Sequence, residues 1–252
     1  MQLQALIFDV DGTLADTEEA HRSAFNEAFQ QYGLDWHWSR PKYAELLRTT
    51  GGKERIGVYV DSLGLTPDEQ RPIRERIAAM HATKTDIYTR MVRSGAVPLR
   101  EGVTALLEEA RRAQVALAIA TTTSLANIDA LLSTHLGPDA LTLFSVIGAG
   151  DQVTRKKPAP DIYQWVLGQL ALPASACVAV EDSVNGVRSA KGAGLFTLVT
   201  PSYWTESEDF TAADWVLPSL ASSVGLLGSL ASAMAGGKLP GSSQDKAKIR
   251  LA

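Results

Sequence analysis

The stretch QALIFDVDGT at residues 4–13 is an apolar run that ends in two carboxylates. The run Gln4 to Phe8 is almost wholly apolar, which predicts a strand covered on both faces. Asp9 and Asp11 follow two residues apart, so the period of a strand aims both side chains the same way. Their repulsion is roughly 3 kcal/mol at ~6 Å and an effective dielectric constant of ~20. We therefore expect a cation, a shared proton or a substrate beside them.

A hairpin with Asp11 and Gly12 at its turn is the alternative for this stretch. The residues from Asp16 onward have the spacing of a helix and do not alternate, which disfavours a hairpin. In an open parallel sheet, ligands bind outside the carboxyl ends of the strands. Polar residues that follow other buried runs are therefore candidates for the same site.

Four further runs of the same apolar kind recur along the chain: Val115–Ala120, Leu143–Ile147, Cys177–Val180 and Leu195–Val199. The segments between them carry helical spacing. Repeated strand–helix units predict an α/β fold with a Rossmann-like parallel sheet.

An insertion interrupts this pattern, since more than a hundred residues separate the first run from the second. Residues 16–92 have helical spacing broken by glycine and proline, which predicts an all-helical cap domain. The core domain is then expected to comprise residues 1–15 and 93–220. Residues 221–252 are rich in Ser, Gly and Ala, which predicts a C-terminal helix followed by a low-complexity tail.

Composition excludes several classes of protein. The 252 residues are 45% hydrophobic, and 24 Lys and Arg against 28 Asp and Glu leave a net charge of −4, which argues against disorder and against a nucleic-acid coat. Cys177 is the single cysteine, so no internal disulfide can form, and a buried thiol in a reducing compartment is expected. No basic leader precedes the first run, and the uncharged stretch 220–235 is too short for a membrane span. We expect a cytoplasmic protein with no membrane or nucleic-acid partner.

Polar residues close three of the later runs. Thr121 to Ser124 offer hydroxyls and backbone N–H groups where a helix is expected to begin, which suits an anion. Glu181 to Ser183 bring two more carboxylates. Both segments could equally be ordinary helix caps. Lys156 and Lys157 precede Pro158 on a constrained loop that can aim a charge, although a solvated surface loop is the alternative for at least one of them.

Together these groups predict metal-assisted phosphoryl transfer. The hard oxygen ligands of Asp9 and Asp182 suit Mg²⁺. Thr121 and Lys157 would hold phosphoryl oxygens and offset charge in the transition state. One carboxylate of the first pair can attack phosphorus to form an aspartyl phosphate, while the other donates a proton to the leaving alcohol. Spacing alone does not tell which of the two attacks.

These four motifs resemble those of the haloacid-dehalogenase-like phosphatases over residues 1 to about 220. The resemblance makes Asp9 the nucleophile and Asp11 the general acid/base, with Thr121 and Lys157 holding the phosphate. An acid at the position of Asp11 favours phosphate esters over haloacids. The resemblance implies that Asp9, the Asp11 carbonyl and Asp182 bind Mg²⁺ directly, with Glu181 in or near the layer of residues just outside these ligands.

The cap resembles that of the β-phosphoglucomutase-like subgroup. The stretches 35–38 (Asp-Trp-His-Trp), 49–55 and 121–124 are similar to those of the CbbY family. This resemblance implies a phosphatase that hydrolyses xylulose-1,5-bisphosphate to xylulose 5-phosphate. The bisphosphate is a misfire product of Rubisco and inhibits that enzyme. The resemblance therefore implies a role in support of the Calvin cycle.

A substrate with two phosphates needs cations away from the reacting one. Lys53 and Arg55 follow a Gly-Gly loop that would be a poor choice merely to join helices. His81 and Lys84 share a helix face, where packing is an equal alternative. His21 could be a satisfied helix histidine, although the resemblance places it beside the catalytic acid. The predicted substrate-binding residues are Glu18, His21, Gly51, Gly52, Lys53, Glu54, Arg55, His81, Lys84, Thr122 and Thr123.

Two other functions stay open at this point. A phosphomutase would use the same carboxylates and return the phosphoryl group to the sugar. A non-catalytic binding module would gain nothing from a repelling pair of aspartates. In each case the expected ligand is a phosphosugar, and the expected assembly is a monomer or a weak dimer.

Overall fold

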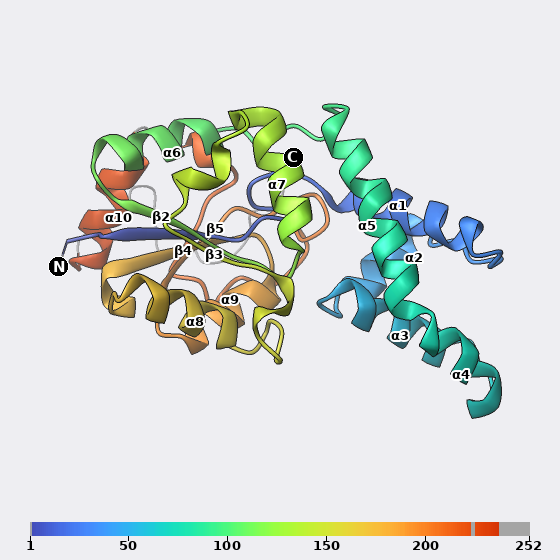
Figure 1. Cartoon of the computed structure of the whole chain (residues 1–252). Helices are drawn as coiled ribbons and strands as arrows, with labels where there is room; N and C mark the ends of the chain where they lie inside the picture. The colour runs from blue at the N-terminus through green and yellow to red at the C-terminus, as the bar shows by residue number, and fades with distance from the viewer. Residues whose placement is uncertain (1, 223–224, 237–252) are drawn as a thin grey trace.

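The computed structural model describes residues 2–222 and 225–236 and contains a six-stranded sheet (Figure 1). The strand order is β3-β2-β1-β4-β5-β6, and every neighbouring pair is parallel. The strands are β1 (Ala5–Phe8), β2 (Ala116–Ala120), β3 (Val146–Gly148), β4 (Cys177–Glu181), β5 (Phe196–Val199) and β6 (Trp215–Val216). The α/β fold with a parallel sheet is thus as predicted.

The strands match the apolar runs to within one residue at each end, with two larger differences. β3 begins three residues later than expected, because Ala140–Leu143 form a 3₁₀ turn (η1) and pairing with β2 starts only at Val146. β6 was not predicted, since two residues are too few to show periodicity. Cys177 opens β4 and is fully buried, as expected.

Helices cover both faces of the sheet (Figure 1). On one face lie α6 (Val103–Arg112), α7 (Leu125–Leu136) and α10 (Leu226–Met234), and on the other α8 (Asp161–Leu170) and α9 (Val184–Gly192). Leu6 and Phe8 of β1 pack on the first face, and Ala5 and Ile7 on the second. Burial on both faces explains why the runs are apolar throughout.

Five helices occupy the inserted segment: α1 (Glu18–Gln31), α2 (Arg40–Leu46), α3 (Gly52–Asp61), α4 (Pro67–Glu75) and α5 (Ile77–Arg93). They lie beside the sheet (Figure 1), and we call them the cap. The cap has its own aromatic cluster, in which Phe25, Phe29, Trp38 and Tyr43 are fully buried. It is thus internally packed, and we propose that it is a domain of its own, as the sequence suggests.

Two segments join the cap to the sheet, and they lie side by side. Ala15 bridges Leu99, and the N–H of Arg100 donates to the Leu14 carbonyl at 2.8 Å. The Arg100 guanidinium donates to the backbone carbonyls of Gly12, Thr200 (2.8 Å) and Pro201 (2.7 Å). A single side chain therefore ties both connections to the edge of the sheet.

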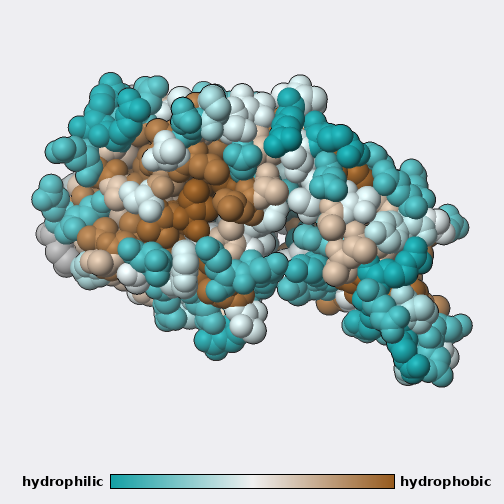
Figure 2. Space-filling model, viewed as in Figure 1, coloured by the Kyte–Doolittle hydropathy of each residue, from teal (hydrophilic) through white to brown (hydrophobic). Residues whose placement is uncertain are grey.

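The C-terminal helix expected within 221–252 is α10, whereas residues 237–252 of the predicted tail lie outside the described residues. Figure 2 shows hydrophilic side chains over most of the visible cap, while hydrophobic ones gather over the sheet part. In the described ranges no helix has the length and apolar character that a bilayer crossing requires.

Candidate active site

The predicted chemical residues meet at the carboxyl edge of the sheet. Asp9 follows β1, Thr121 follows β2, Glu181 ends β4 and Asp182 comes directly after it, while Lys157 lies in the loop before α8. We call these five residues the core rim. Parallel neighbouring strands place their carboxyl ends at one edge, so residues far apart in sequence come together.

A cavity of about 840 Å³ lies between the core rim and the cap. Every residue predicted from the sequence to bind substrate, phosphate or metal lines this cavity, except Glu181, which is fully buried. The cap residues Glu18, His21, Arg55, His81 and Lys84 form part of its lining, and we call them the cap wall. The structure thus brings the two predicted groups to one site.

Lys157 is the centre of the core rim. Its Nζ donates to Asp9 Oδ1 at 2.8 Å and to Glu181 Oε1 at 2.6 Å, and the side chain is 4% exposed. Burial alone would lower the pKa of Lys157, but the two carboxylates outweigh it and raise the pKa, so the ammonium stays charged. Lys156 instead reaches the Gly150 carbonyl and Asp151.

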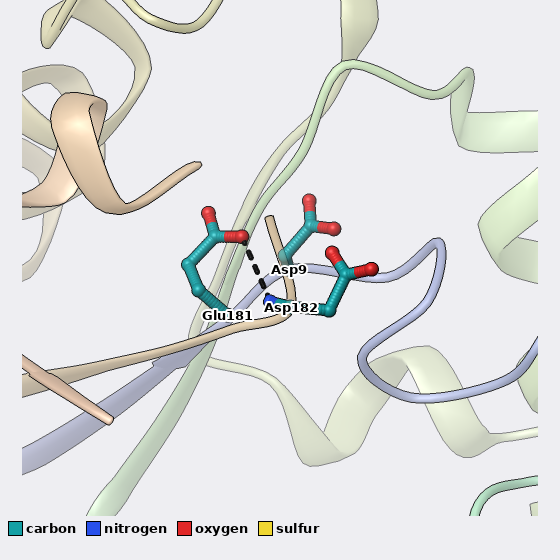
Figure 3. Close-up of side chains that lie close together, drawn as sticks. All are labelled: Asp9, Glu181 and Asp182. Carbon is teal, nitrogen blue, oxygen red and sulfur yellow. Dashed lines mark hydrogen bonds between the residues drawn. The ribbon is translucent and has the colours of Figure 1, made fainter. Parts of the chain in front are cut away.

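The three acids of the core rim, Asp9, Glu181 and Asp182, lie close together (Figure 3), and one lysine cannot offset three carboxylates. Burial raises the pKa of Asp9 to about 7, although Lys157 opposes this. Burial, and then Asp9 and Glu181, raise the pKa of Asp182 well above its usual value. Among the ion pairs of residues 2–222 and 225–236, none neutralises Asp182, whose Oδ2 accepts a hydrogen bond from the Ser202 hydroxyl at 2.8 Å.

A divalent cation fits this excess charge. Asp9, Glu181 and Asp182 each offer a carboxylate oxygen, and these oxygens lie within 4.8 Å of one another. Carboxylate oxygens are ligands that hard cations prefer. Gly12 has φ +82°, and a Cβ there would overlap the Asp182 carboxylate, so only glycine lets the backbone approach this acid.

Asp11 is held by the segment that leads into the cap. Its Oδ1 accepts from Thr17 Oγ1 at 2.6 Å and lies 2.9 Å from His21 Nε2. On the other side of the ring, His21 Nδ1 lies 2.5 Å from Lys84 Nζ. Burial would raise the pKa of Asp11, but His21, Thr17 and Lys84 together hold it below its usual value. The two aspartates of the first motif therefore have different partners.

The cap wall carries buried positive groups. Burial lowers the pKa of Lys84 to about 7, against the attraction of Asp11 and Glu18. Arg55 is 8% exposed, and its Nη1 donates to the Tyr43 hydroxyl at 2.9 Å, which in turn donates to Glu18 at 2.5 Å. The Arg55 Nε is buried without a hydrogen-bond partner among the described residues. A guanidinium that lines the cavity is suited to an anion.

Burial lowers the pKa of His81 to about 3, and the positive charges of Lys84 and Lys53 add to this effect. The His81 ring is therefore neutral at pH 7. Lys53 lies at the exposed mouth of the site and pairs with Asp151 of the loop after β3 at 3.0 Å. The Gly-Gly loop has a steric reason, because a Cβ on Gly52 would overlap His81 and Gly51 has φ +92°.

The segment Thr121 to Ser124 was predicted to be either an anion site or an ordinary helix cap, and its residues serve different purposes. Ser124 is the cap of α7, since its hydroxyl accepts from the Asn127 N–H at 3.3 Å. Thr123 accepts from the Asn127 side chain at 2.8 Å. Thr121 and Thr122 line the cavity, and Thr121 is almost fully buried.

Several residues that contact the site were not found from the sequence, among them Thr17 and Ser202, which donate to Asp11 and Asp182. Tyr43 joins Glu18 to Arg55, and the Trp204 ring meets Tyr43 edge-on at 5.5 Å. Tyr163 donates to Glu181 at 2.6 Å. Tyr163 lies six residues after Lys157 on the next helix, and this nearness was the one usable signal, whereas Trp204 comes from a loop without a motif.

Comparison with known proteins adds the relatives of this chain. A sequence model of the haloacid dehalogenase-like hydrolases matches residues 6–200. Protein CbbY of Rhodobacter capsulatus is 51% identical over 220 residues, covering 87% of this chain and 95% of the relative. Protein CbbY of Cereibacter sphaeroides is 48% identical over 226 residues, covering 90% and 96%.

Solved structures agree with this similarity. A crystal structure of CbbY from Rhodobacter sphaeroides in complex with phosphate has a TM-score of 0.81 and 47% identity, covering 88% of this chain and 96% of that one. An aspartate-to-asparagine mutant of that protein was solved in complex with xylulose-1,5-bisphosphate, with a TM-score of 0.82 and the same identity and coverage. A β-phosphoglucomutase from Clostridium difficile, at 20% identity and a TM-score of 0.70, shares the fold.

Proposed function

Because this chain belongs to the haloacid dehalogenase-like hydrolases and, among them, to the CbbY family, we propose that it removes one phosphate from xylulose-1,5-bisphosphate and leaves xylulose 5-phosphate. The chain is thus a phosphoric monoester hydrolase. The observation that carries the proposal is a shared cavity whose two sides differ, with acids and Lys157 on the core rim and the basic side chains of Arg55 and Lys84 on the cap wall.

The core rim supplies the groups for phosphoryl transfer. Lys157 and Thr121 hold the phosphoryl oxygens, and Lys157 also keeps Asp9 in place through its 2.8 Å hydrogen bond. An Asp9 oxygen attacks phosphorus, the bond from phosphorus to the sugar oxygen breaks, and an aspartyl phosphate forms. Asp11 gives a proton to the departing sugar oxygen and later takes one from the water that hydrolyses the aspartyl phosphate.

We propose Mg²⁺ as the cation, held by Asp9, Asp182 and the Asp11 carbonyl. The raised pKa values of Asp9 and Asp182 support a cation at this position, because burial makes both charges costly and Lys157 offsets only part of them. When bound, Mg²⁺ neutralises charge on the carboxylates and on the phosphoryl oxygens.

The cap wall selects the substrate. Arg55, a buried cation, and Lys84, a buried amine with a pKa of about 7, line the same cavity, and Lys53 stands at its mouth. A second, unreacted phosphate would offset these charges. His21 and Glu18 complete the binding residues, with His21 holding Asp11. We also expect a cytoplasmic monomer or weak dimer that acts on a small phosphosugar.

The test is release of inorganic phosphate from a panel of five- and six-carbon sugar monophosphates and bisphosphates in the presence of Mg²⁺. Xylulose-1,5-bisphosphate should give the highest kcat/KM, and Asp9→Asn protein prepared in parallel should release none. No release from any member of the panel would remove the proposal. Incubation of glucose-1-phosphate with a bisphosphate primer supplies a second arm, in which an isomeric sugar phosphate without free phosphate would indicate a mutase.

A further inference from the structure

Tyr163 lies under the core rim and touches two of its members. It is fully buried in α8, and its hydroxyl donates to Glu181 Oε1 at 2.6 Å. The same oxygen accepts from Lys157 Nζ at 2.6 Å. The Tyr163 ring also faces Lys157, with Nζ 5.1 Å from the ring centroid. One side chain thus contacts both ends of the Lys157–Glu181 ion pair.

Glu181 has little freedom in this environment. Its side chain is fully buried, and its Oε2 accepts from the Asp182 N–H at 3.3 Å. On the other side the chain passes so close that a Cβ at Gly186 would overlap the carboxylate. The hydroxyl of Tyr163 fixes Oε1, the oxygen that Lys157 uses, whereas the other contacts act on Oε2 and on the carboxylate as a whole.

The position of Lys157 Nζ depends on Glu181, because this ammonium is shared between Glu181 and Asp9 at distances of 2.6 and 2.8 Å. A carboxylate oxygen with one donor instead of two attracts that donor more strongly and turns more freely. Either change would move positive charge away from the oxygens of a phosphoryl group on Asp9.

We propose that Tyr163 is a positioning residue for Lys157: its hydroxyl occupies one lone pair of Glu181 Oε1 and its ring supports the ammonium, so that Lys157 stays aimed at Asp9. This inference rests on the proposed phosphatase function. Lys157 would act in the transition state, where charge builds up on the phosphoryl oxygens, so the role of Tyr163 belongs to kcat rather than to substrate binding.

Tyr163→Phe isolates the hydroxyl, because phenylalanine keeps the ring and its packing. We expect kcat per folded protein to fall about tenfold with KM changed less than about twofold, the loss typical of one hydrogen bond to a charged group. Tyr32→Phe is the matched control. It removes a hydroxyl that lies 3.4 Å from Thr83 in the cap, and it should leave both constants within about twofold of wild type.

Thermal unfolding of the three proteins separates a positioning role from a packing role. A lowered unfolding temperature with unchanged kcat would overturn the inference, as would a rise in KM alone. Wild-type protein that releases no phosphate from any sugar phosphate refutes the proposed function instead. Turnover by wild type with equal kcat in Tyr163→Phe refutes only the role of Tyr163.

The route through Glu181 has its own test in a double variant. If Tyr163 acts through Glu181, then adding Tyr163→Phe to Glu181→Gln should lower kcat by less than about twofold beyond Glu181→Gln alone. Effects of the two substitutions that multiply would show independent actions and would overturn the proposed route.

Discussion

The core rim and the cap wall face each other across one cavity, yet they are built in opposite ways. The core rim takes its residues from the ends of parallel strands and from the loops after them, and its contacts join residues as far apart as Asp9 and Lys157. The cap wall takes its residues from helices, and an aromatic cluster supports them from behind.

Their electrostatics are opposite as well. Acids with raised pKa values dominate the core rim, whereas the cap wall holds Lys84 and His81, whose pKa values burial lowers. The difference suggests a division of labour. Changes in the core rim should lower turnover of every phosphate ester, while changes in the cap wall should alter which ester is preferred.

Asp11 gives the largest expected effect and tests where that division lies, because it follows β1 but takes its hydrogen bonds from Thr17 and His21. Asp11→Asn should lower kcat roughly 10³-fold on every substrate, the usual weight of a general acid. Steady-state phosphate release measures it. Asp16→Asn, which changes an exposed acid near Arg100, is the control and should stay within about threefold of wild type. A loss confined to bisphosphates would assign Asp11 to substrate selection instead.

Arg55→Met should raise KM for xylulose-1,5-bisphosphate about 30-fold, because a charge-assisted hydrogen bond to the second phosphate is lost. KM for p-nitrophenyl phosphate, which has one phosphate, should change less than about threefold. The ratio of the two KM values is the measurement. An equal rise for both esters would contradict the separate roles of cap wall and core rim.

Asp182→Asn should raise the unfolding temperature of metal-free protein by about 3 °C at pH 8, because burial raises the pKa of Asp182 and so makes its ionisation costly only in the folded state, whereas asparagine carries no such cost and keeps an acceptor for the Ser202 hydroxyl. The gain should vanish near pH 4. There Asp182 is protonated in the folded wild type, because its pKa is raised. Stability due to this group is present at low pH and lost as pH rises through the folded pKa.

Added Mg²⁺ completes this experiment. It should raise the unfolding temperature of wild-type protein at pH 8 but have little effect on Asp182→Asn. Calorimetric scans with chelator or with Mg²⁺ measure both effects. A variant that is less stable than wild type in chelator would show that Asp182 is already compensated within the chain.

Lys53→Gln should have the smallest effect, about a threefold rise in KM for the bisphosphate. Lys53 is partly exposed and already paired with Asp151, so a substrate phosphate gains little beyond the ion pair it replaces. Asp151→Asn is the complementary variant. It removes the ion pair of Lys53, so the KM for the bisphosphate should fall slightly. A large loss in Lys53→Gln alone would move Lys53 into the same class as Arg55.

The difference between the two regions also explains what the sequence could predict. An acid that directly follows an apolar run, as Asp9 and Glu181 do, indicates the end of a strand. Parallel pairing then brings these strand ends to one edge of the sheet. The core rim could therefore be predicted from the sequence. Tyr163, which supports it, could not, because a buried tyrosine on a helix resembles ordinary packing.

The cap wall was less predictable. Helical spacing placed His81 and Lys84 on one face, as α5 confirms, but not the contact between Lys84 and His21 of α1. Tyr43 and Trp204 are far apart in the sequence but in contact in the structure, and hydrophobic periodicity cannot predict such a contact. The register of α1 against α5 and the loop that holds Trp204 depend on three-dimensional packing.

Arg100 has a consequence for how the molecule can move. Because its guanidinium holds the Gly12, Thr200 and Pro201 carbonyls, the pivot for any swing of α1 to α5 lies beyond Leu14 and Leu99. Opening the cavity to exchange sugar for solvent would then leave the nucleophile stationary while Asp11 loses His21. The nucleophile Asp9 would then be in place in every state, whereas the general acid Asp11 would be held by His21 only when the cap is closed.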